Sequence, residues 1–171
     1  MGLFSFNLAF QRPADQIWEA SKSDIYNMFS GVDGSFTDLK LERAGYGLMS
    51  FDPETGMKLP DMAQFISKML HTYALTAQVV DSDFSVMQLY YDGNMLEESY
   101  IGVIYDEFAD ACPLGIPNLE LWKQLLLDEG KTDLLAEALH EEAVFVEDQL
   151  RKISELTGIP IMENGLMEAL V

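Results

Sequence analysis

The spacing of apolar residues changes along the chain, and each change predicts a new element. A first strand is expected where apolar residues alternate with smaller or polar ones, at Phe4, Phe6, Leu8 and Phe10. A helix is expected after Pro13, because the following apolar residues recur at helical spacing. Residues 35–51 alternate less regularly and predict one or two short strands.

The clearest helix is expected to begin at Asp61, because Gln64 three residues later completes the spacing of a capping box. Its apolar stripe comprises Met62, Phe65, Ile66, Met69, Leu70 and Tyr73. Three apolar, β-rich runs follow, at residues 75–80, 84–91 and 95–103. Asp92-Gly93 joins the last two runs and is a dipeptide that tight primed turns prefer, because both central residues need positive φ. The three runs predict an antiparallel meander.

The C-terminal third is expected to be helical. Asn118 is placed to cap a helix that ends at Gly130. Thr132 is placed to cap a second helix reaching about Leu156, with a break allowed near its middle. Residues 160–171 are expected to form either a short docking helix or a frayed tail.

This order of elements predicts an α+β fold: a mostly antiparallel sheet with a central meander, whose helices cover one face. The 171 residues suit a single domain spanning 1–171. With 49% of its residues hydrophobic, the chain has enough apolar material for a core.

The charge balance narrows the range of partners. The sequence has 29 Asp and Glu against 10 Lys and Arg, a formal charge of −19, and a pI near 4.1. Nucleic acids and anionic membranes are bound chiefly through Lys and Arg, so neither is expected as a partner. Such a charge attracts cations and basic proteins, although it also serves solubility alone.

Cysteine usage and the first residues bear on the compartment. The single cysteine, Cys112, cannot form an internal disulfide, and it is expected to be a bystander thiol rather than a nucleophile. The first residues lack the basic start and long apolar run of a signal peptide, and no stretch approaches the ~20 apolar residues of a membrane span. We therefore expect a cytoplasmic protein.

No catalytic signature stands out, so no catalytic residue, metal site or cofactor is predicted. The two histidines do not have the spacing of a zinc-protease motif, and no glycine-rich nucleotide fingerprint is complete. Asp81 and Asp83 could hold a hard cation through their oxygens. They lie between two predicted strands, however, where Asp is an ordinary turn residue.

The predicted hairpin contains a conflict between burial and charge. If Asp92-Gly93 is a two-residue turn, Glu98 shares a face with Met87 and Leu89, and Glu97 lies on the other face. Both faces are largely apolar, and an ionised carboxylate is expensive to bury unpaired. One of the two glutamates must therefore reach water at a sheet margin, be paired, or belong to a site.

The site alternative is a cleft or partner surface lined by tyrosines and acids. Tyrosine suits such surfaces because its ring buries area while its hydroxyl still forms hydrogen bonds. The candidate binding residues are Asp81, Asp83, Tyr90, Tyr91, Glu97, Glu98 and Tyr100.

Two parts of the sequence resemble an uncharacterised bacterial family of acidic α+β proteins, some of which are similar to immunity proteins of contact-dependent toxin systems. The segments that carry the resemblance are 78–83, 89–93, 96–99, 145–150 and 156–160. The resemblance covers about half of the chain and implies a bacterial cytoplasmic protein. It implies no catalytic activity, and it assigns no residue a role.

Three hypotheses follow. The first is a non-enzymatic binding protein for a basic protein partner, similar to an immunity or inhibitor protein. The second is a metal- or small-molecule-dependent enzyme that uses carboxylates and tyrosines near the meander. The third is a structural homodimer that pairs through an outer strand.

Overall fold

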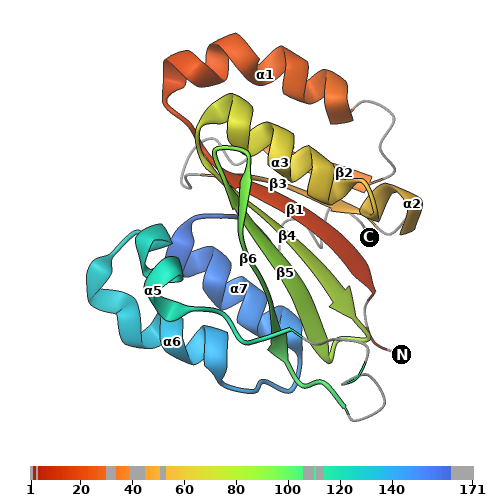
Figure 1. The fold of residues 1–171 in the computed structure, drawn as a ribbon, viewed down its shortest axis with the longest axis vertical. Helices are drawn as coiled ribbons and strands as arrows, with labels where there is room; N and C mark the ends of the chain where they lie inside the picture. The colour runs from red at the N-terminus through yellow and green to blue at the C-terminus, as the bar shows by residue number, and fades with distance from the viewer. Residues whose placement is uncertain are drawn as a thin grey trace.

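The computed structural model describes residues 2, 4–29, 34–38, 45–50, 53–105, 110 and 114–162, and it confirms an α+β fold (Figure 1). Its strands are β1 (Ser5–Gln11), β2 (Gly34–Asp38), β3 (Gly45–Ser50), β4 (Tyr73–Val80), β5 (Phe84–Tyr91) and β6 (Asn94–Gly102). Its α-helices are α1 (Asp15–Phe29), α2 (Pro53–Gly56), α3 (Leu59–Leu70), α5 (Leu119–Trp122), α6 (Thr132–His140) and α7 (Val146–Thr157).

The strands form a six-stranded sheet in the order β2-β3-β1-β4-β5-β6, and each neighbouring pair is antiparallel. The predicted meander is confirmed as β4, β5 and β6. Asp92 and Gly93 form its second turn with φ values of 48° and 80°, as a primed turn requires. The first strand in the sequence, β1, lies between β3 and β4 in the sheet.

Helices cover both faces of the sheet, so the expectation of a single covered face is wrong. Side chains alternate between the faces along each strand. In β4, Ala74 packs into a core beneath α1 and α3, whereas Leu75 packs into a second core with α6 and α7. In β5, Tyr90 packs into the core beneath α1 and α3, and Leu89 packs into the core with α6 and α7. Strands that are apolar on both faces need a helical layer on each.

Helix α3 begins earlier than the capping-box spacing predicts. Its N-cap is Lys58, which makes no side-chain capping bond, and Pro60 lies in its first turn. Asp61 is therefore a first-turn acid, which favours the positive end of the helix dipole without capping it. The helix ends at Leu70, so Tyr73 belongs to β4 rather than to the helical stripe.

The C-terminal helices are shorter than expected. Asn118 caps α5 as predicted, and its side chain accepts a hydrogen bond from the Glu120 N–H at 3.0 Å. The α-helix gives way at Lys123–Leu125 to a 3-10 turn instead of reaching Gly130. The break allowed in the next helix separates α6 from α7.

The end of the last helix is as expected, with Gly158 in the left-handed conformation at its C-cap. Ile161 and Met162 are buried in the core with α7, and residues 163–171 of the predicted tail lie outside the described residues. In the part of the chain that is described, no helix has both the length and the apolar character needed to cross a membrane.

Candidate functional site

A β-bulge exchanges the sheet faces on which Glu97 and Glu98 were expected to lie. Tyr91 pairs with Asn94, as a two-residue turn requires, but the register shifts between Leu89 and Tyr90. Beyond the shift, Glu97 pairs with Leu89 and Glu98 pairs with Gln88. Glu97 therefore lies on the face of α6 and α7, and Glu98 lies on the face of α3.

Glu97 links β6 to the start of α5. One carboxylate oxygen, Oε2, accepts the backbone N–H of Asn118 at 2.8 Å. The other, Oε1, accepts the indole N–H of Trp122 at 2.7 Å and the hydroxyl of Ser99 at 3.2 Å. Since three donors compensate this half-buried carboxylate, Glu97 has a structural role in joining the sheet to the C-terminal helices.

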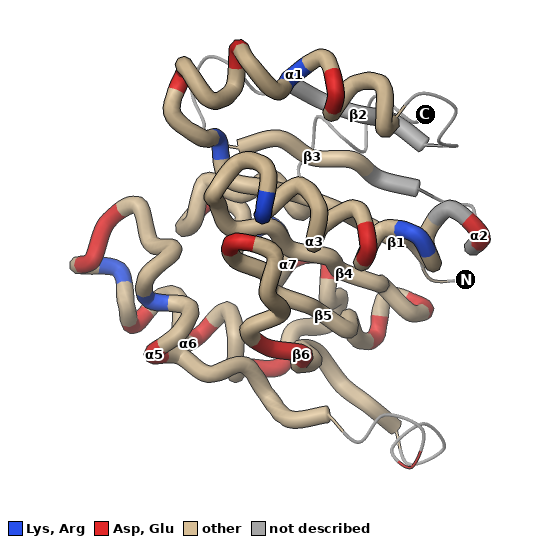
Figure 2. The backbone as a smooth tube through the Cα atoms, turned by 45° about the horizontal axis from the view of Figure 1, so that its top comes forward, with Lys and Arg blue, Asp and Glu red and all other residues tan. Residues whose placement is uncertain are grey.

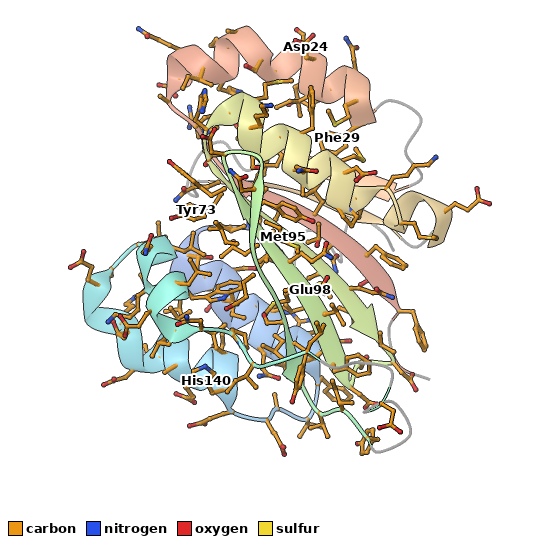
Figure 3. The ribbon with its side chains drawn as sticks, in the orientation of Figure 1. Asp24, Phe29, Tyr73, Met95, Glu98 and His140 are labelled. Atoms are coloured by element: carbon orange, nitrogen blue, oxygen red, sulfur yellow. The ribbon has the colours of Figure 1, made fainter. Side chains whose placement is uncertain are left out.

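Glu98, labelled in Figure 3, is exposed on the outer strand β6, and it ends a row of polar side chains that crosses the sheet. Its Oε2 accepts a hydrogen bond from Gln88 Nε2. Gln88 Oε1 in turn accepts from Thr76 Oγ1 at 3.2 Å and from the Tyr90 hydroxyl at 3.0 Å. Burial raises the pKa of Tyr90, and the nearby charges of Glu98 and Asp61 raise it further.

Asp81 and Asp83 lie in the turn between β4 and β5, at the far end of the meander from Asp92-Gly93. Asp81 Oδ1 accepts the Gly2 N–H at 2.8 Å, and the Asp83 backbone carbonyl accepts the Val103 N–H at 2.9 Å. Between them, the Ser82 hydroxyl donates to buried Glu147 in the first turn of α7 at 2.5 Å. These contacts make the turn a junction between the sheet and α7.

The remaining candidates lie apart from these groups. Tyr91 is exposed, and its ring packs against that of Tyr73 with centroids 4.6 Å apart. Tyr100 is half-buried, and its backbone N–H donates to the Gly115 carbonyl at 3.1 Å. The structure thus brings Tyr90 and Glu98 together through Gln88, and it gathers no single cleft from all seven predicted residues.

A separate hollow lies where the end of α6 meets the start of α7. We call it the acidic slot. Its volume is about 500 Å³, and it is lined by Glu137, Ala138, Glu141, Glu142, Ala143, Asp148, Gln149 and Lys152.

Two of the four acids in the acidic slot have a cationic neighbour. Asp148 pairs with Arg151 at 2.6 Å, and Glu137 pairs with Lys152 at 3.4 Å. Glu141 and Glu142 are exposed, and neither side chain forms an ion pair within the described part of the chain. Along the whole chain, Lys and Arg residues are few compared with Asp and Glu residues (Figure 2). The slot therefore carries uncompensated negative charge.

Gln149 forms part of the wall of the acidic slot. Its side chain is buried, at 4% exposure for the residue, and its Nε2 donates to the carbonyls of Ala138 and Glu141. Because both carbonyls belong to residues of the slot, the amide group lies at the slot as well. Its Oε1 has no hydrogen-bond partner among the described residues. A buried acceptor without a donor raises the free energy of the folded state, and this oxygen is itself closed to solvent.

The loop between α6 and α7 exposes two large apolar side chains. Val144 is 85% exposed and Phe145 is 55% exposed. Ala143, the residue before them, lines the acidic slot. Apolar anchors beside charged groups are typical of the centre and rim of protein interfaces.

Sequence reasoning would treat Glu137 and Glu141 as ordinary solvated charges on a helix. The signal that could have found the acidic slot is the apolar pair Val144-Phe145 within the helix break, one residue after Glu141-Glu142. Cys112, the expected bystander thiol, lies outside the described residues. No group of three or more His, Cys, Asp or Glu side chains in the described part is arranged to hold a metal ion.

The chain matches no protein-family model, and no significantly similar curated protein or solved structure was found.

Proposed function

We propose that the protein is a non-enzymatic binding protein whose acidic slot receives a cationic side chain of a basic protein partner. The observation that carries this proposal is a slot in which the uncompensated carboxylates of Glu141 and Glu142 lie next to an exposed apolar pair in the chain. A guanidinium group fits this combination because it carries both a positive charge and five N–H donors. Arginine is accordingly the favoured side chain.

The exposed pair Val144 and Phe145 supports a protein partner rather than a free cation. A small cation gains nothing from apolar side chains next to its site, whereas a protein surface buries them and gains roughly 1.5–3 kcal/mol for each side chain fully buried. The overall charge of −19 would speed the encounter with a basic surface. An immunity or inhibitor protein that neutralises a cationic toxin is one form of this function.

The test is an NMR titration of the ¹⁵N-labelled protein with an acetylated and amidated tetra-arginine peptide. We expect saturable shifts at the Gln149 side-chain amide and at Glu141 and Glu142. Replacing both glutamates, Glu141→Gln with Glu142→Gln, should weaken binding about tenfold, at roughly 0.7 kcal/mol for each exposed charge. Binding should be lost at about 1 M salt, where the Debye length is about 3 Å.

A matched control removes the same charge elsewhere. Asp24→Asn with Glu129→Gln changes exposed acids on α1 and in the loop before α6, and Asp24 lies at the opposite end of the molecule from His140, the last residue of α6 (Figure 3). The control should weaken binding less than twofold. Equal weakening by both double variants would show that only net charge attracts the peptide, and the proposed slot would be refuted.

A second comparison tests the apolar loop. A tetra-arginine peptide extended by one tryptophan should bind the wild-type protein more tightly than tetra-arginine alone. Val144→Ser with Phe145→Ser should remove this difference without lowering the affinity for tetra-arginine. If the tryptophan adds nothing in the wild-type protein, the loop is not part of the binding surface.

A further inference from the structure

A second hollow lies on the α3 face of the sheet, near the junction of α2 and α3, and it is distinct from the acidic slot. We call it the amide pocket. Its volume is about 140 Å³, and the lining residues that bear on its chemistry are Phe6, Leu59, Thr76, Gln78, Val86 and Gln88.

The walls of the amide pocket are apolar and closely packed. Phe6 of β1 packs onto Gly56 so closely that an added Cβ would lie 2.1 Å from the phenyl ring. Leu59 at the start of α3 and Val86 of β5 supply aliphatic surface. An apolar cavity of about 150 Å³ in another protein holds benzene, so the amide pocket has room for one ring.

The polar groups of the pocket are uncharged. Gln88 is held in place because its Oε1 accepts from Thr76 and Tyr90 while its Nε2 donates to Glu98. This arrangement leaves the second N–H of the Gln88 amide and the lone pairs of the Thr76 hydroxyl for a ligand. Gln78 is exposed, and its amide makes no hydrogen bond within the described part of the chain. The pocket therefore offers donors and acceptors together.

The charges around the pocket favour a neutral ligand. None of the described residues that line it has an ionisable side chain. Two acids act on the polar row, since Glu98 bonds to Gln88 and Asp61 acts on Tyr90, whereas Lys58, between the lining residues Met57 and Leu59, is exposed. An anion would be repelled by these acids, and a cation would lose water without gaining a paired carboxylate.

We infer that the amide pocket binds an uncharged, single-ring compound carrying a carboxamide or lactam group. The ring would pack against Phe6, Leu59 and Val86. The amide of the ligand has one acceptor and at least one donor, which complement the Gln88 N–H and the Thr76 hydroxyl. This site is independent of the acidic slot, and it would add small-molecule binding to the proposed protein binding.

The test uses benzamide, benzoate and toluene as probes of equal ring size, followed through the side-chain amide signals of Gln78 and Gln88. Benzamide should bind at least tenfold more tightly than either of the other two. Toluene binding as tightly as benzamide would show a merely apolar cavity, and benzoate binding as tightly would refute the charge argument. Benzamide shifts that do not saturate, or that miss both glutamines, would also overturn the inference.

A matched pair of variants provides the control. Gln78→Glu places a charge at the pocket while keeping the shape of the side chain, and it should weaken benzamide binding at least fivefold. Gln124→Glu makes the same change at the Tyr73 hydroxyl, outside the pocket, and should leave binding unchanged. Equal affinities for benzamide in the two variants would place the ligand elsewhere. Tetra-arginine binding should be the same in both variants, so failure here leaves the acidic slot unaffected.

Discussion

Replacing Glu97 tests the bulged register of the hairpin and the junction between β6 and α5. Glu97→Ala removes the acceptor for the Trp122 indole N–H and the Asn118 backbone N–H. Trp122 is only 1% exposed, so its N–H would lose its partner in a place that water reaches poorly. Glu98→Ala is the matched control, because Glu98 is exposed and Gln88 is its only hydrogen-bond partner among the described residues.

The magnitude follows from the two strongest bonds. Hydrogen bonds to a charged group contribute about 1.5–3 kcal/mol each, and the lower figure applies because Glu97 is half-buried and water can partly replace it. Glu97→Ala should therefore lower the free energy of unfolding by about 3 kcal/mol. At about 2–4 °C per kcal/mol for a chain of this size, the Tm should fall by about 6–12 °C. Glu98→Ala should cost less than about 1 kcal/mol.

Urea unfolding followed by tryptophan fluorescence and by circular dichroism measures both changes. In a hairpin without the bulge, Glu98 would share the face of Met87 and Leu89 and would be the residue near Trp122. A larger loss for Glu98→Ala would therefore refute the bulged register. Equal losses for the two variants would refute the role of Glu97 in joining β6 to α5.

Three further changes test other parts of the fold. Ser82→Ala should lower the free energy of unfolding by about 2 kcal/mol, because buried Glu147 loses its hydroxyl donor; thermal unfolding measures it, and a loss below about 0.5 kcal/mol would contradict the junction. Gly102→Ala should cost more than Gly93→Ala in the same assay. Both residues have positive φ, but a Cβ on Gly102 would lie 2.3 Å from the Asp83 carbonyl oxygen, whereas on Gly93 it would meet only the flexible Lys68 side chain. Burial raises the pKa of Tyr90, so its contribution to stability is complete below the unfolded pKa of 10.0 and is lost as pH rises through the folded pKa. Between neutral pH and a pH above 10.0, the free energy of unfolding should therefore fall further for the wild-type protein than for Tyr90→Phe, which has no hydroxyl to ionise. An identical pH profile for the two proteins would contradict this.

Local signals in the sequence predict those elements whose cause is local. The Asp92-Gly93 turn and the Asn118 cap follow from the backbone needs of two or three residues, and the structure confirms both. The start of α3 is mispredicted because Asp61 and Gln64 have capping-box spacing wherever the helix begins. A spacing rule identifies a helix more securely than it identifies the first residue of that helix.

The faces of β6 could not be assigned in the same way. A two-residue turn fixes the pairing of Tyr91 with Asn94, but an extra residue beyond it exchanges the two faces. The conflict between two apolar faces and two adjacent glutamates was the only sign of irregularity. Its resolution depends on Trp122 and Asn118, which lie more than twenty residues away in sequence.

Glu97 and Gln149 differ in how far the described residues satisfy the hydrogen-bonding atoms of their side chains. Both side chains are polar groups at the boundary between packed elements, where each unpaired atom raises the free energy of the folded state. Glu97 meets three donors from the chain itself, so nothing more is needed to explain its position. Gln149 uses both amide hydrogens within the chain, and its buried oxygen has no hydrogen-bond partner among the described residues. The described residues satisfy Glu97 fully and Gln149 only in part, so the wall of the slot between α6 and α7 is the less completely bonded of the two boundaries, which is consistent with the binding role proposed for the slot.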